Sequence, residues 1–511
     1  MTYAEALEHL NALGPELAPT PASAASPAPP RRKFDLAHMR TLAHALGDPQ
    51  LRFPSVLIAG TNGKGSTAAT LANILAAAGY RTALYTSPHL VHVNERIQIS
   101  APASPTEYSS ADVPASAGPA YLHPIPDADF ARLYMLVDDT AQRLVQAGDL
   151  PHPPSFFEVL TAIAFCYFAG LHHTGAAEHP AEHPVDIAIL EVGLGGRLDA
   201  TNIVDPILSI LTDIALDHQD YLGDTIALIA REKCGILRPH GTLVTLPQHP
   251  EANQAIGESA ATLDLHAISA ADFIPSQLPT LAAHAENPLL LPSNHYTVTL
   301  EGQPLQVDSP LPGHHQQRNI ALAIAAASAL RNQSSDKIAI SNQKGYKISN
   351  QAIEAGIRNT HWPGRLELLP NTTPPLLLDV AHNPAGAWTL RAAIAQLPEA
   401  QPRTLIFSCL RDKSLTEMAR ILLPLFDSSP DGSPCRPHDH IILAPIDSPR
   451  AASVEDLLAT AHALSIPAHA APHLAGALAQ ARQITPPNGL IIATGSVYLV
   501  GEIRRLAQVS A

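Results

Sequence analysis

A glycine-rich turn near the start of the chain carries the clearest chemical signal. Residues 59–67, AGTNGKGST, follow the apolar run 55–59 and lead into the alanine-rich stretch 66–79. Small residues let successive backbone N–H groups surround phosphate oxygens, and the start of the following helix adds partial positive charge. Lys64 can neutralise β- and γ-phosphates, and the Ser66 hydroxyl can reach a Mg²⁺ ion. The residues of this phosphate loop that we predict to bind a nucleotide are Gly60, Thr61, Asn62, Gly63, Lys64, Gly65, Ser66 and Thr67.

The phosphate loop departs from the usual pattern GxxxxGK[ST] in two places. Ile58 occupies the position of the first glycine, and Gly65 separates Lys64 from Ser66. A glycine-rich strand–helix turn with a solvent-facing lysine is therefore the alternative interpretation. Because an apolar run and a helical pattern flank the turn in the required order, we favour a nucleotide site.

A second glycine-rich stretch, EVGLGGRLDATN at 191–202, does not predict a dinucleotide site. Leu198 stands where the third glycine is expected, and no helical pattern follows directly. Glu191 comes just after an apolar run, where a carboxylate can supply a hard oxygen ligand to a nucleotide-bound Mg²⁺. The alternative is a carboxylate that only caps the strand end. Asp199 and Asn202 either recognise a polar heterocycle or hold the turn.

These motifs lie among short apolar runs that alternate with longer helical patterns, such as the one at 315–331. Runs that are apolar throughout are typical of parallel strands covered on both faces. The strand candidates are 55–59, 185–190, 207–212, 241–246, 376–380, 404–408, 440–445 and 490–495. The alternation predicts an α/β fold, with a large P-loop NTPase-like domain built on a parallel sheet and a smaller Rossmann-like C-terminal domain.

The boundary between the two predicted domains lies near residue 360, where the alternation restarts after Trp-Pro-Gly. The expected domains are therefore 1–360 and 361–511. Four segments are weak in periodic pattern, and their composition indicates loops inserted into a compact scaffold. These insertions are 14–32, 101–128, 172–184 and 331–347.

The composition excludes several classes of protein. Of 511 residues, 46% are hydrophobic and 15% are charged, so the chain can form buried cores. Its formal net charge of -15 argues against a nucleic-acid partner, which requires a basic surface. The four cysteines lie far apart and fit neither a metal motif nor a disulfide framework. A signal peptide or membrane-spanning run is not apparent, so we expect a cytoplasmic protein with no membrane partner.

Nine segments along the chain form an ordered set of motifs. They are GTNGKGST (60–67), TSPHLVHVNERI (86–97), EVGLGGRLDATNIVD (191–205), LDHQDYLG (216–223), AREKCGI (230–236), GHHQQRN (313–319), WPGRLE (362–367), DVAHNP (379–384) and TGSVYLVG (494–501). Together they resemble the folylpolyglutamate synthase/dihydrofolate synthase family of the Mur ligase superfamily. The resemblance spans both predicted domains. It implies an ATP-dependent ligase of folate biosynthesis and polyglutamylation, which adds L-glutamate to dihydropteroate or reduced folates through an acyl phosphate.

The resemblance implies Mg²⁺ as the cofactor, bound by Ser87, Glu191 and His218 together with Ser66. It also implies that Lys233, in the segment REKC, is carbamylated and takes part in catalysis. A neutral lysine amine can take up CO₂ when its pKa is depressed, and burial favours that state. An ordinary lysine on a charged helix face is the alternative. A monovalent cation is a further candidate ligand.

The ATP site implied by the resemblance includes residues beyond the phosphate loop. Asn319 and Arg365 would contact ATP, and Asp379 would meet its adenosine end. Lys64 would act in catalysis as well as in binding. ATP would thus lie between the two domains, with its phosphates on the first and its base against the second.

The glutamate site implied by the resemblance lies in the C-terminal domain. His382 and Asn383 would stand near the reacting phosphate or the incoming glutamate, with His382 as a catalytic residue. Ser496, which follows the last strand, is a further glutamate-site candidate. Val380 replaces the glycine of the family's D-G-A-H-N motif, so this turn departs from the family pattern.

The folate or pterin site implied by the resemblance lies in the first domain. Residues 87–96 would form a loop between ATP and folate, and Phe157 opens a helix predicted at 156–170. Packing in the core is an equally good interpretation of Phe157. The other residues implied in this pocket are Asp199, Ala200 and Asn202.

Two other functions compete with this prediction. A cell-wall ligase of the same superfamily would use a nucleotide-linked peptide, but the motifs at 191–202 and 230–236 favour folate, and the phosphate loop begins too early for a preceding nucleotide-sugar domain. A non-catalytic P-loop protein is disfavoured by the second α/β domain. We expect a monomer whose domains close about a hinge near 360–365, because an acyl phosphate must be kept from water.

Overall fold

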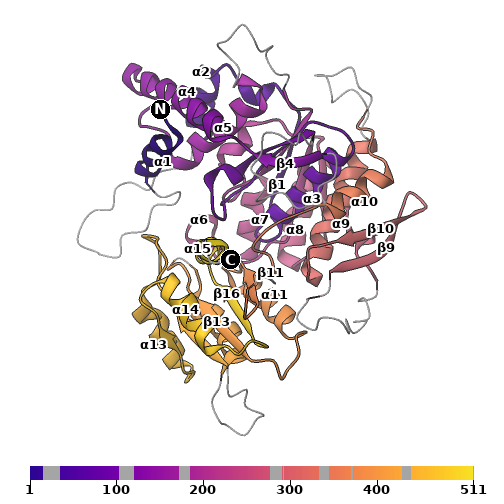
Figure 1. Ribbon diagram of the computed structural model, residues 1–511. Helices are drawn as coiled ribbons and strands as arrows, with labels where there is room; N and C mark the ends of the chain where they lie inside the picture. Colours follow the sequence, from indigo (N-terminus) through magenta and orange to yellow (C-terminus); the bar gives the residue numbers. More distant parts are fainter. Residues whose placement is uncertain are drawn as a thin grey trace.

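The computed structural model of the protein describes most of the chain. The described residues are 1–14, 35–102, 120–171, 184–276, 291, 293–332, 345–369, 372–411, 413–427 and 439–509. They form two lobes that meet along one face, the first drawn in indigo to salmon and the second in orange to yellow (Figure 1). Each lobe has its own sheet and its own apolar cores.

The sheet of the N-terminal lobe has the strand before the phosphate loop near its centre. Among the described residues, eight strands pair in the order β4-β3-β2-β5-β1-β6-β7-β8. Their bounds are β1 (Ser55–Ala59), β2 (Thr82–Tyr85), β3 (Ile97–Pro102), β4 (Ala120–Pro124), β5 (Ile187–Glu191), β6 (Leu208–Leu211), β7 (Thr242–Thr245) and β8 (His266–Ser269). Strand β3 pairs antiparallel with both β2 and β4, and the other neighbours pair parallel. The carboxyl ends of the parallel strands therefore share one edge, where open α/β sheets bind ligands.

Helices cover both faces of this sheet, which explains its continuous apolar runs. In β1, Leu57 and Ala59 join one core, and Val56 and Ile58 join the other. The first core is covered by α1 (Tyr3–Ala12), α2 (Leu36–Ala45), α4 (Asp127–Ala147), α5 (Phe156–Phe168), α7 (Ile226–Cys234) and α8 (Pro250–Thr262). The second is covered by α3 (Lys64–Ala77), α9 (His314–Asn332), α10 (Asn350–Arg358) and the hairpin of β9 (Asn294–Leu300) and β10 (Gln303–Ser309).

The C-terminal lobe repeats the α/β arrangement on a smaller scale. In the part of the chain that the structure describes, its strands pair in the order β11-β12-β16-β13-β14-β15. Their bounds are β11 (Glu367–Leu369), β12 (Leu376–Asp379), β13 (Arg403–Phe407), β14 (His440–Leu443), β15 (His469–Ala470) and β16 (Leu490–Thr494). One face carries α11 (Pro384–Ile394), α12 (Leu415–Leu422) and α13 (Val454–Ala463), and the other carries α14 (Leu474–Ile484) and α15 (Val497–Val509).

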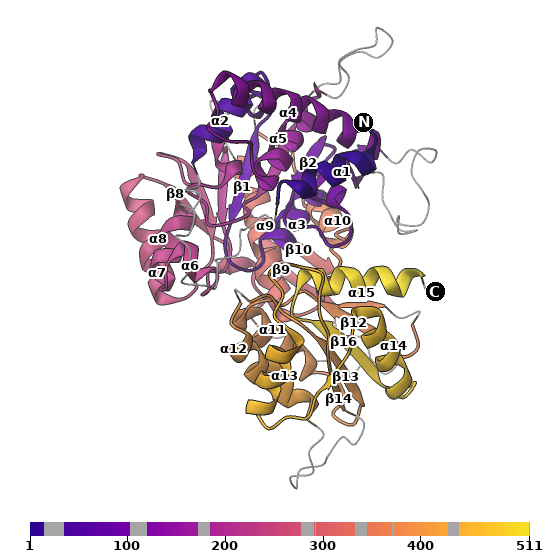
Figure 2. The same ribbon diagram turned by 90° about the vertical axis from the view of Figure 1, so that its left-hand side faces the viewer.

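Helix α15 lies between the two lobes in both views (Figure 1 and Figure 2). Its residue Gly501 touches the N-terminal lobe, because an added Cβ there would stand 1.8 Å from the Leu90 carbonyl oxygen. Leu90 also packs against a core of the C-terminal lobe. The loop that follows β2 is therefore part of the contact between the lobes.

The predicted α/β fold with two largely parallel sheets is confirmed, and each predicted strand is present within two residues. The interpretation of 101–128 as an insertion was wrong in part, because β4 and the start of α4 lie in it. As an edge strand, β4 lacks the continuous apolar run that marks a covered central strand. Most of the predicted insertions lie outside the described residues, at 15–32, 103–119, 172–183 and 333–344. Within the described ranges, no helix is long and apolar enough to cross a membrane.

Gly356 lets α10 approach α3 closely, which predicts a packing effect. An added Cβ at Gly356 would lie 2.3 Å from the Ile74 Cα atom. Gly356→Ala should therefore destabilise the protein by about 2 kcal/mol through overpacking, measured as a lower Tm in calorimetry. Gly257 of α8 is the matched control, because nothing lies within 4 Å of its Cβ position. Gly257→Ala should stabilise by about 0.5 kcal/mol, and equal effects at the two sites would contradict the prediction.

Candidate active site

The phosphate loop connects β1 to α3 and is shaped by two neighbouring segments. Thr61 and Asn62 donate their backbone N–H groups to the Asp213 carbonyl oxygen, at 2.8 and 3.1 Å. Gly63 has a φ of 86°, and an added Cβ would stand 2.1 Å from Asn319 Oδ1. Glycine alone fits this conformation and this contact. Asn319, predicted separately to bind ATP, therefore touches the phosphate loop.

A lysine and a buried carboxylate face each other beside the loop. Strand β5 lies next to β1 with Glu191 opposite Ile58, which brings the carboxylate to the start of α3. Glu191 Oε1 is 4.0 Å from Lys64 Nζ, and Oε2 accepts a hydrogen bond from the Ser87 backbone N–H at 3.2 Å. Burial raises the pKa of Glu191, although the charge of Lys64 favours the ionised form. A second cation beside Glu191 would further stabilise its ionised form.

The oxygen donors near Glu191 fit a magnesium ion. Magnesium prefers hard oxygen ligands and usually keeps waters and phosphate oxygens in its shell. Ser66 is buried in the first turn of α3, and Ser87 follows β2 beside Glu191. Across the described ranges, no three Asp, Glu, His or Cys side chains converge so that they could hold a metal. The protein thus offers a partial shell suited to a metal that arrives with a nucleotide.

Lys233 reaches the phosphate loop from α7. Its Nζ donates a hydrogen bond to the Gly60 carbonyl oxygen at 2.7 Å, and the residue is 4% exposed. Burial, followed by the charge of Lys64, lowers the pKa of Lys233 to about 7. A substantial fraction of this amine is therefore neutral near pH 7, which is the state that reacts with CO₂. Its carbamylation stays a prediction.

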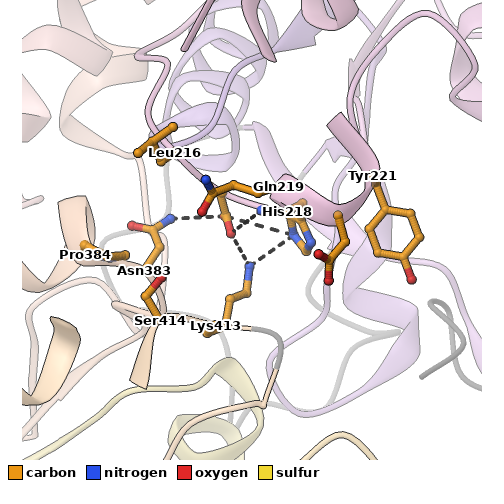
Figure 3. Close-up of a pocket in the computed structure, with 10 residues that line it drawn as sticks. Leu216, His218, Gln219, Tyr221, Asn383, Pro384, Lys413 and Ser414 are labelled. Atoms are coloured by element: carbon orange, nitrogen blue, oxygen red, sulfur yellow. Dashed lines mark hydrogen bonds and ion pairs between the residues drawn. The ribbon is translucent and has the colours of Figure 1, made fainter. Parts of the chain in front are cut away.

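A buried ion pair joins the two lobes at this edge (Figure 3). Asp217 lies in the loop after β6, and Lys413 lies in the loop after β13. Lys413 Nζ donates hydrogen bonds to Asp217 Oδ1 at 2.6 Å and to His218 Nε2 at 3.1 Å. Burial alone raises the pKa of Asp217, but Lys413, His218 and His382 together hold it well below its ordinary value. His218, the predicted metal ligand, is thus brought to this ion pair.

Asn383 connects three parts of the site. Its Nδ2 group donates hydrogen bonds to Asn62 Oδ1 of the phosphate loop at 3.0 Å and to Asp217 Oδ2 at 3.2 Å. Its Oδ1 accepts a hydrogen bond from the Gly386 N–H, which caps the start of α11. The cap orients the amide group towards the N-terminal lobe.

His382 is held in one tautomer beside Asn383. Its Nδ1 donates to the Val380 carbonyl oxygen at 2.9 Å, and because a carbonyl only accepts, that nitrogen carries the proton. Its Nε2 lies 3.9 Å from Asp217 Oδ2. Burial, and then the charge of Lys413, lowers the pKa of His382 to about 4. At neutral pH the ring is uncharged, and Nε2 carries a lone pair rather than a proton.

A polar pocket of about 110 Å³ opens between the lobes at this junction (Figure 3). Residues 216–221 line it from the N-terminal lobe, where 219–222 form the short helix α6 (Gln219–Leu222). Asn383, Pro384, Lys413 and Ser414 line it from the C-terminal lobe. A pocket of this size with a buried lysine and facing carboxylates suits a small molecule that carries both charges.

Known proteins show the same arrangement of domains. A family model of the Mur ligase middle domain matches residues 171–327, and one of the Mur ligase glutamate ligase domain matches 364–497. The folylpolyglutamate synthase of Lacticaseibacillus casei is 33% identical over 395 residues, covering 77% of this chain and 80% of that protein. The dihydrofolate synthase/folylpolyglutamate synthase of Bacillus subtilis is 31% identical over 475 residues, covering 93% and 95%. The chain belongs to the folylpolyglutamate synthase/dihydrofolate synthase family.

Solved structures of this family share the fold over almost the whole chain. A complex of FPGS with AMPPCP and folate has a TM-score of 0.72 and 28% identity, covering 99% of this chain and 100% of that one. Folylpolyglutamate synthase of Mycobacterium tuberculosis, complexed with ADP and AMPPCP, has a TM-score of 0.72 and 28% identity, covering 93% and 95%. The protein is an ATP-dependent ligase.

Asp379 and Ser496, which belong to two of the family motifs, lie at the carboxyl edge of the second sheet. Asp379 ends β12 and accepts hydrogen bonds from the backbone N–H groups of Leu366 and Ala381, at 3.0 and 2.9 Å. Burial raises the pKa of Asp379 to about 6. Ser496 is buried after β16, and its hydroxyl accepts a hydrogen bond from the Tyr498 N–H. Both side chains therefore stabilise the turns in which they lie, through hydrogen bonds to backbone N–H groups.

Arg365 stands in the family's WPGR segment between the lobes. Its guanidinium lies 5.3 Å from the centre of the Trp362 ring and donates a hydrogen bond to the Pro363 carbonyl oxygen at 2.8 Å. Burial lowers the pKa of Arg365, opposed by the charges of Glu191 in one lobe and Asp379 in the other. Its predicted contact with ATP stays a prediction.

The residues predicted for the folate side mainly organise the loop after β5. Asp199 accepts hydrogen bonds from the backbone and hydroxyl of Thr201 and from the Leu194 N–H. Asn202 Nδ2 donates to two backbone carbonyls, and its Oδ1 accepts from Arg238. Of the two roles open to these side chains from the sequence, the contacts favour the one that holds the turn.

Phe157 lies at the start of α5 with its ring against the same loop. An added Cβ on Gly193 would stand 2.6 Å from Phe157 Cζ, and the ring centre is 6.0 Å from that of Tyr85. Phe157 is partly buried and packs against the first core, and Ala200 is buried in that core. Core packing thus accounts for these contacts, and the predicted contact with a pterin stays untested.

Sequence reasoning missed two residues of the junction, Asp217 and Lys413. Both lie in loops after the carboxyl ends of parallel strands, which is where ligands bind in such sheets. Their position after strand ends could have identified both residues as candidates, and Asp217 also immediately precedes the predicted His218. The sequence contains no indication that these two loops, from different lobes, face each other.

The buried pair predicts a loss of stability when only one partner is removed. Lys413→Met leaves the Asp217 carboxylate buried without its cation, so we expect a loss of about 3 kcal/mol and a lower Tm by calorimetry. Adding Asp217→Asn removes the second charge and should recover part of the loss. Glu502→Gln, which breaks the exposed pair with Arg505, should cost under about 1 kcal/mol. If Lys413→Met proved as mild as Glu502→Gln, the assignment of a buried pair would be wrong.

Proposed function

We propose that the protein joins the amine of L-glutamate to a carboxylate of dihydropteroate, of reduced folates or of both. ATP would first phosphorylate the carboxylate, and glutamate would then displace phosphate from the acyl phosphate. The observation that carries the proposal is the contact of Asn62 in the phosphate loop with Asn383 in the C-terminal lobe, beside the polar pocket. A site for phosphoryl transfer and a pocket for a small charged molecule are therefore adjacent.

The relatives support this choice of substrates. The Bacillus subtilis protein is a dihydrofolate synthase/folylpolyglutamate synthase, a name that includes both the synthesis of dihydrofolate and the polyglutamylation of folates. One solved relative holds AMPPCP together with folate. The match of a glutamate ligase domain to 364–497 supports glutamate as the incoming amino acid.

In the first step, a substrate carboxylate oxygen attacks the γ-phosphorus, and the bond to the ADP oxygen breaks. Such transfers are accelerated mainly by positioning and by neutralising charge. Backbone N–H groups of the phosphate loop would hold the phosphates, and Lys64 would balance charge on the transferring group. Bound Mg²⁺ supplies further charge neutralisation, and Glu191, Ser66 and Ser87 would hold it.

In the second step, the glutamate amine attacks the acyl carbon, and phosphate leaves from a tetrahedral intermediate. Lys413 gives the pocket a cation for a glutamate carboxylate, in exchange for part of its contact with Asp217. Glutamate arrives as an ammonium ion, which must lose a proton before it can attack. His382 Nε2 carries no proton, and it would accept that proton once Lys413 has turned towards the glutamate carboxylate, because the Asp217 charge 3.9 Å away then raises the basicity of this nitrogen.

Carbamylation of Lys233 would add an anion beside the phosphate loop. The carbamate nitrogen keeps one N–H, so the hydrogen bond to the Gly60 carbonyl can persist after the reaction with CO₂. The new anion would attract the metal that accompanies ATP. Burial of Lys233 supports this proposal, because it keeps part of the amine neutral.

Closure of the two lobes would protect the acyl phosphate from water. Residues 360–365 join α10 to β11, and we place the hinge and the boundary between the domains 1–360 and 361–511 there. The ion pair of Asp217 with Lys413 and the contact of Asn62 with Asn383 would then belong to the closed arrangement.

A substrate panel tests the reaction. Purified protein is incubated with ATP, labelled glutamate, and either dihydropteroate or tetrahydrofolate. We expect ADP release that depends on the acceptor, and a glutamylated product detected by mass spectrometry. Lys64→Ala should lower turnover at least about 100-fold, because transition-state charge loses its counter-ion. ATP hydrolysis at a rate independent of the acceptor, or near-normal turnover of Lys64→Ala, would refute the proposed reaction.

His382→Ala separates the two steps. If His382 acts only on the glutamate amine, the variant should still release ADP in a burst but lose amide product about 100-fold. The two products are counted in the same reaction, by coupled ADP detection and by labelled glutamate. Equal loss of ADP and amide would count against a role confined to the second step.

A further inference from the structure

Trp362 packs its indole edge against the phosphate loop. An added Cβ at Gly65 would stand 3.1 Å from both Trp362 Nε1 and Cζ2. Gly65 is in the first turn of α3, whereas Trp362 lies in the segment that links α10 to β11. The ring therefore connects the linker between the lobes to the nucleotide-binding turn.

The N–H group of this indole is buried and unsatisfied. Among the described residues, Trp362 Nε1 has no hydrogen-bond partner, and the atom is shielded from water. Buried Trp N–H groups normally have an acceptor, because an unpaired buried donor costs free energy. The hydroxyl of Thr67, also in the first turn of α3, is buried without a partner as well. Two unused donors thus flank the start of this helix.

The surroundings favour an anionic acceptor for the indole. The N-terminus of α3 carries partial positive charge, and Lys64 begins the helix. The Arg365 guanidinium lies 5.3 Å from the ring centre of Trp362. An indole N–H donates and cannot accept, so its partner must supply a lone pair. Phosphate oxygens combine a lone pair with the negative charge that these cations attract.

We propose that Trp362 is a nucleotide ligand, whose Nε1–H group donates to a phosphate oxygen of the nucleotide bound on the phosphate loop. The inference rests on the proposed binding of ATP at residues 60–67 and adds a contact from the linker. It also explains why the residue at position 65 is small, because a side chain there would displace the indole edge. Through this hydrogen bond, a bound phosphate would contact the segment that joins the lobes directly.

Removal of the N–H alone tests the contact. Trp362→Phe keeps an aromatic ring beside Gly65 and Arg365 and loses the donor. We expect ADP to bind about tenfold more weakly by isothermal titration calorimetry. Trp388→Phe makes the same exchange at a residue that is 57% exposed on α11, and ADP affinity should stay unchanged. If Trp362→Phe binds ADP as tightly as the unaltered protein, the inference is overturned.

Fluorescence gives a second readout that needs no change at Trp362. The chain contains two tryptophans, so Trp388→Phe leaves Trp362 as the single tryptophan, which is excited selectively at a wavelength that tyrosine does not absorb. ADP and inorganic tripolyphosphate should both shift its emission, and adenosine should not. An unchanged emission at ADP saturation overturns the contact, and a shift with adenosine equal to that with ADP overturns its assignment to phosphate.

The inference and the proposed function can fail separately. If the protein makes glutamylated folate and binds ADP, but the Trp362 emission and the ADP affinity of Trp362→Phe are unchanged, only the contact from the linker is wrong. If calorimetry detects no ADP binding to the unaltered protein, the proposed function fails first and removes the basis of the inference.

Discussion

The ion pair between Asp217 and Lys413 is the constraint on which the geometry of the site depends. It joins loops at the carboxyl edges of two separate sheets, and the contact of Asn383 with Asn62 lies beside it. A buried pair is costly unless both partners are present and well oriented. The two lobes are therefore held in the arrangement that sets the phosphate loop opposite the start of α11.

Burial shifts the pKa values of the ionisable groups around this pair, downwards for the bases and upwards for the acid. Burial lowers the pKa of Lys233 to about 7 and of His382 to about 4, and it raises the pKa of Glu191. Asp217 stays ionised because the charge of Lys413 opposes the effect of its burial. Uncharged amine and imidazole groups and a buried carboxylate can thus coexist within one small region, where phosphoryl transfer and amide formation need different charge states.

Several residues with a ligand-like chemistry hold the backbone through hydrogen bonds. Asp199 and Asn202 hold the loop after β5, and Asp379 closes the turn after β12. Their hydrogen bonds keep the glycine-rich and DVAHNP segments in place, and these segments position Glu191 and His382. Short polar side chains commonly act in this way, because they bond to nearby backbone groups.

The sequence by itself determined the α/β alternation, the covered strands and the phosphate loop. Each of these depends on residues that are near one another in the chain, such as the run 55–59 and Lys64. Only the tertiary structure decided which distant loops meet: Asp217 and Lys413 are 196 positions apart, and Trp362 comes to Gly65 through the packing of the linker. Local periodicity carries no information about the relative orientation of two sheets, because that orientation depends on how complete cores and buried charges fit together.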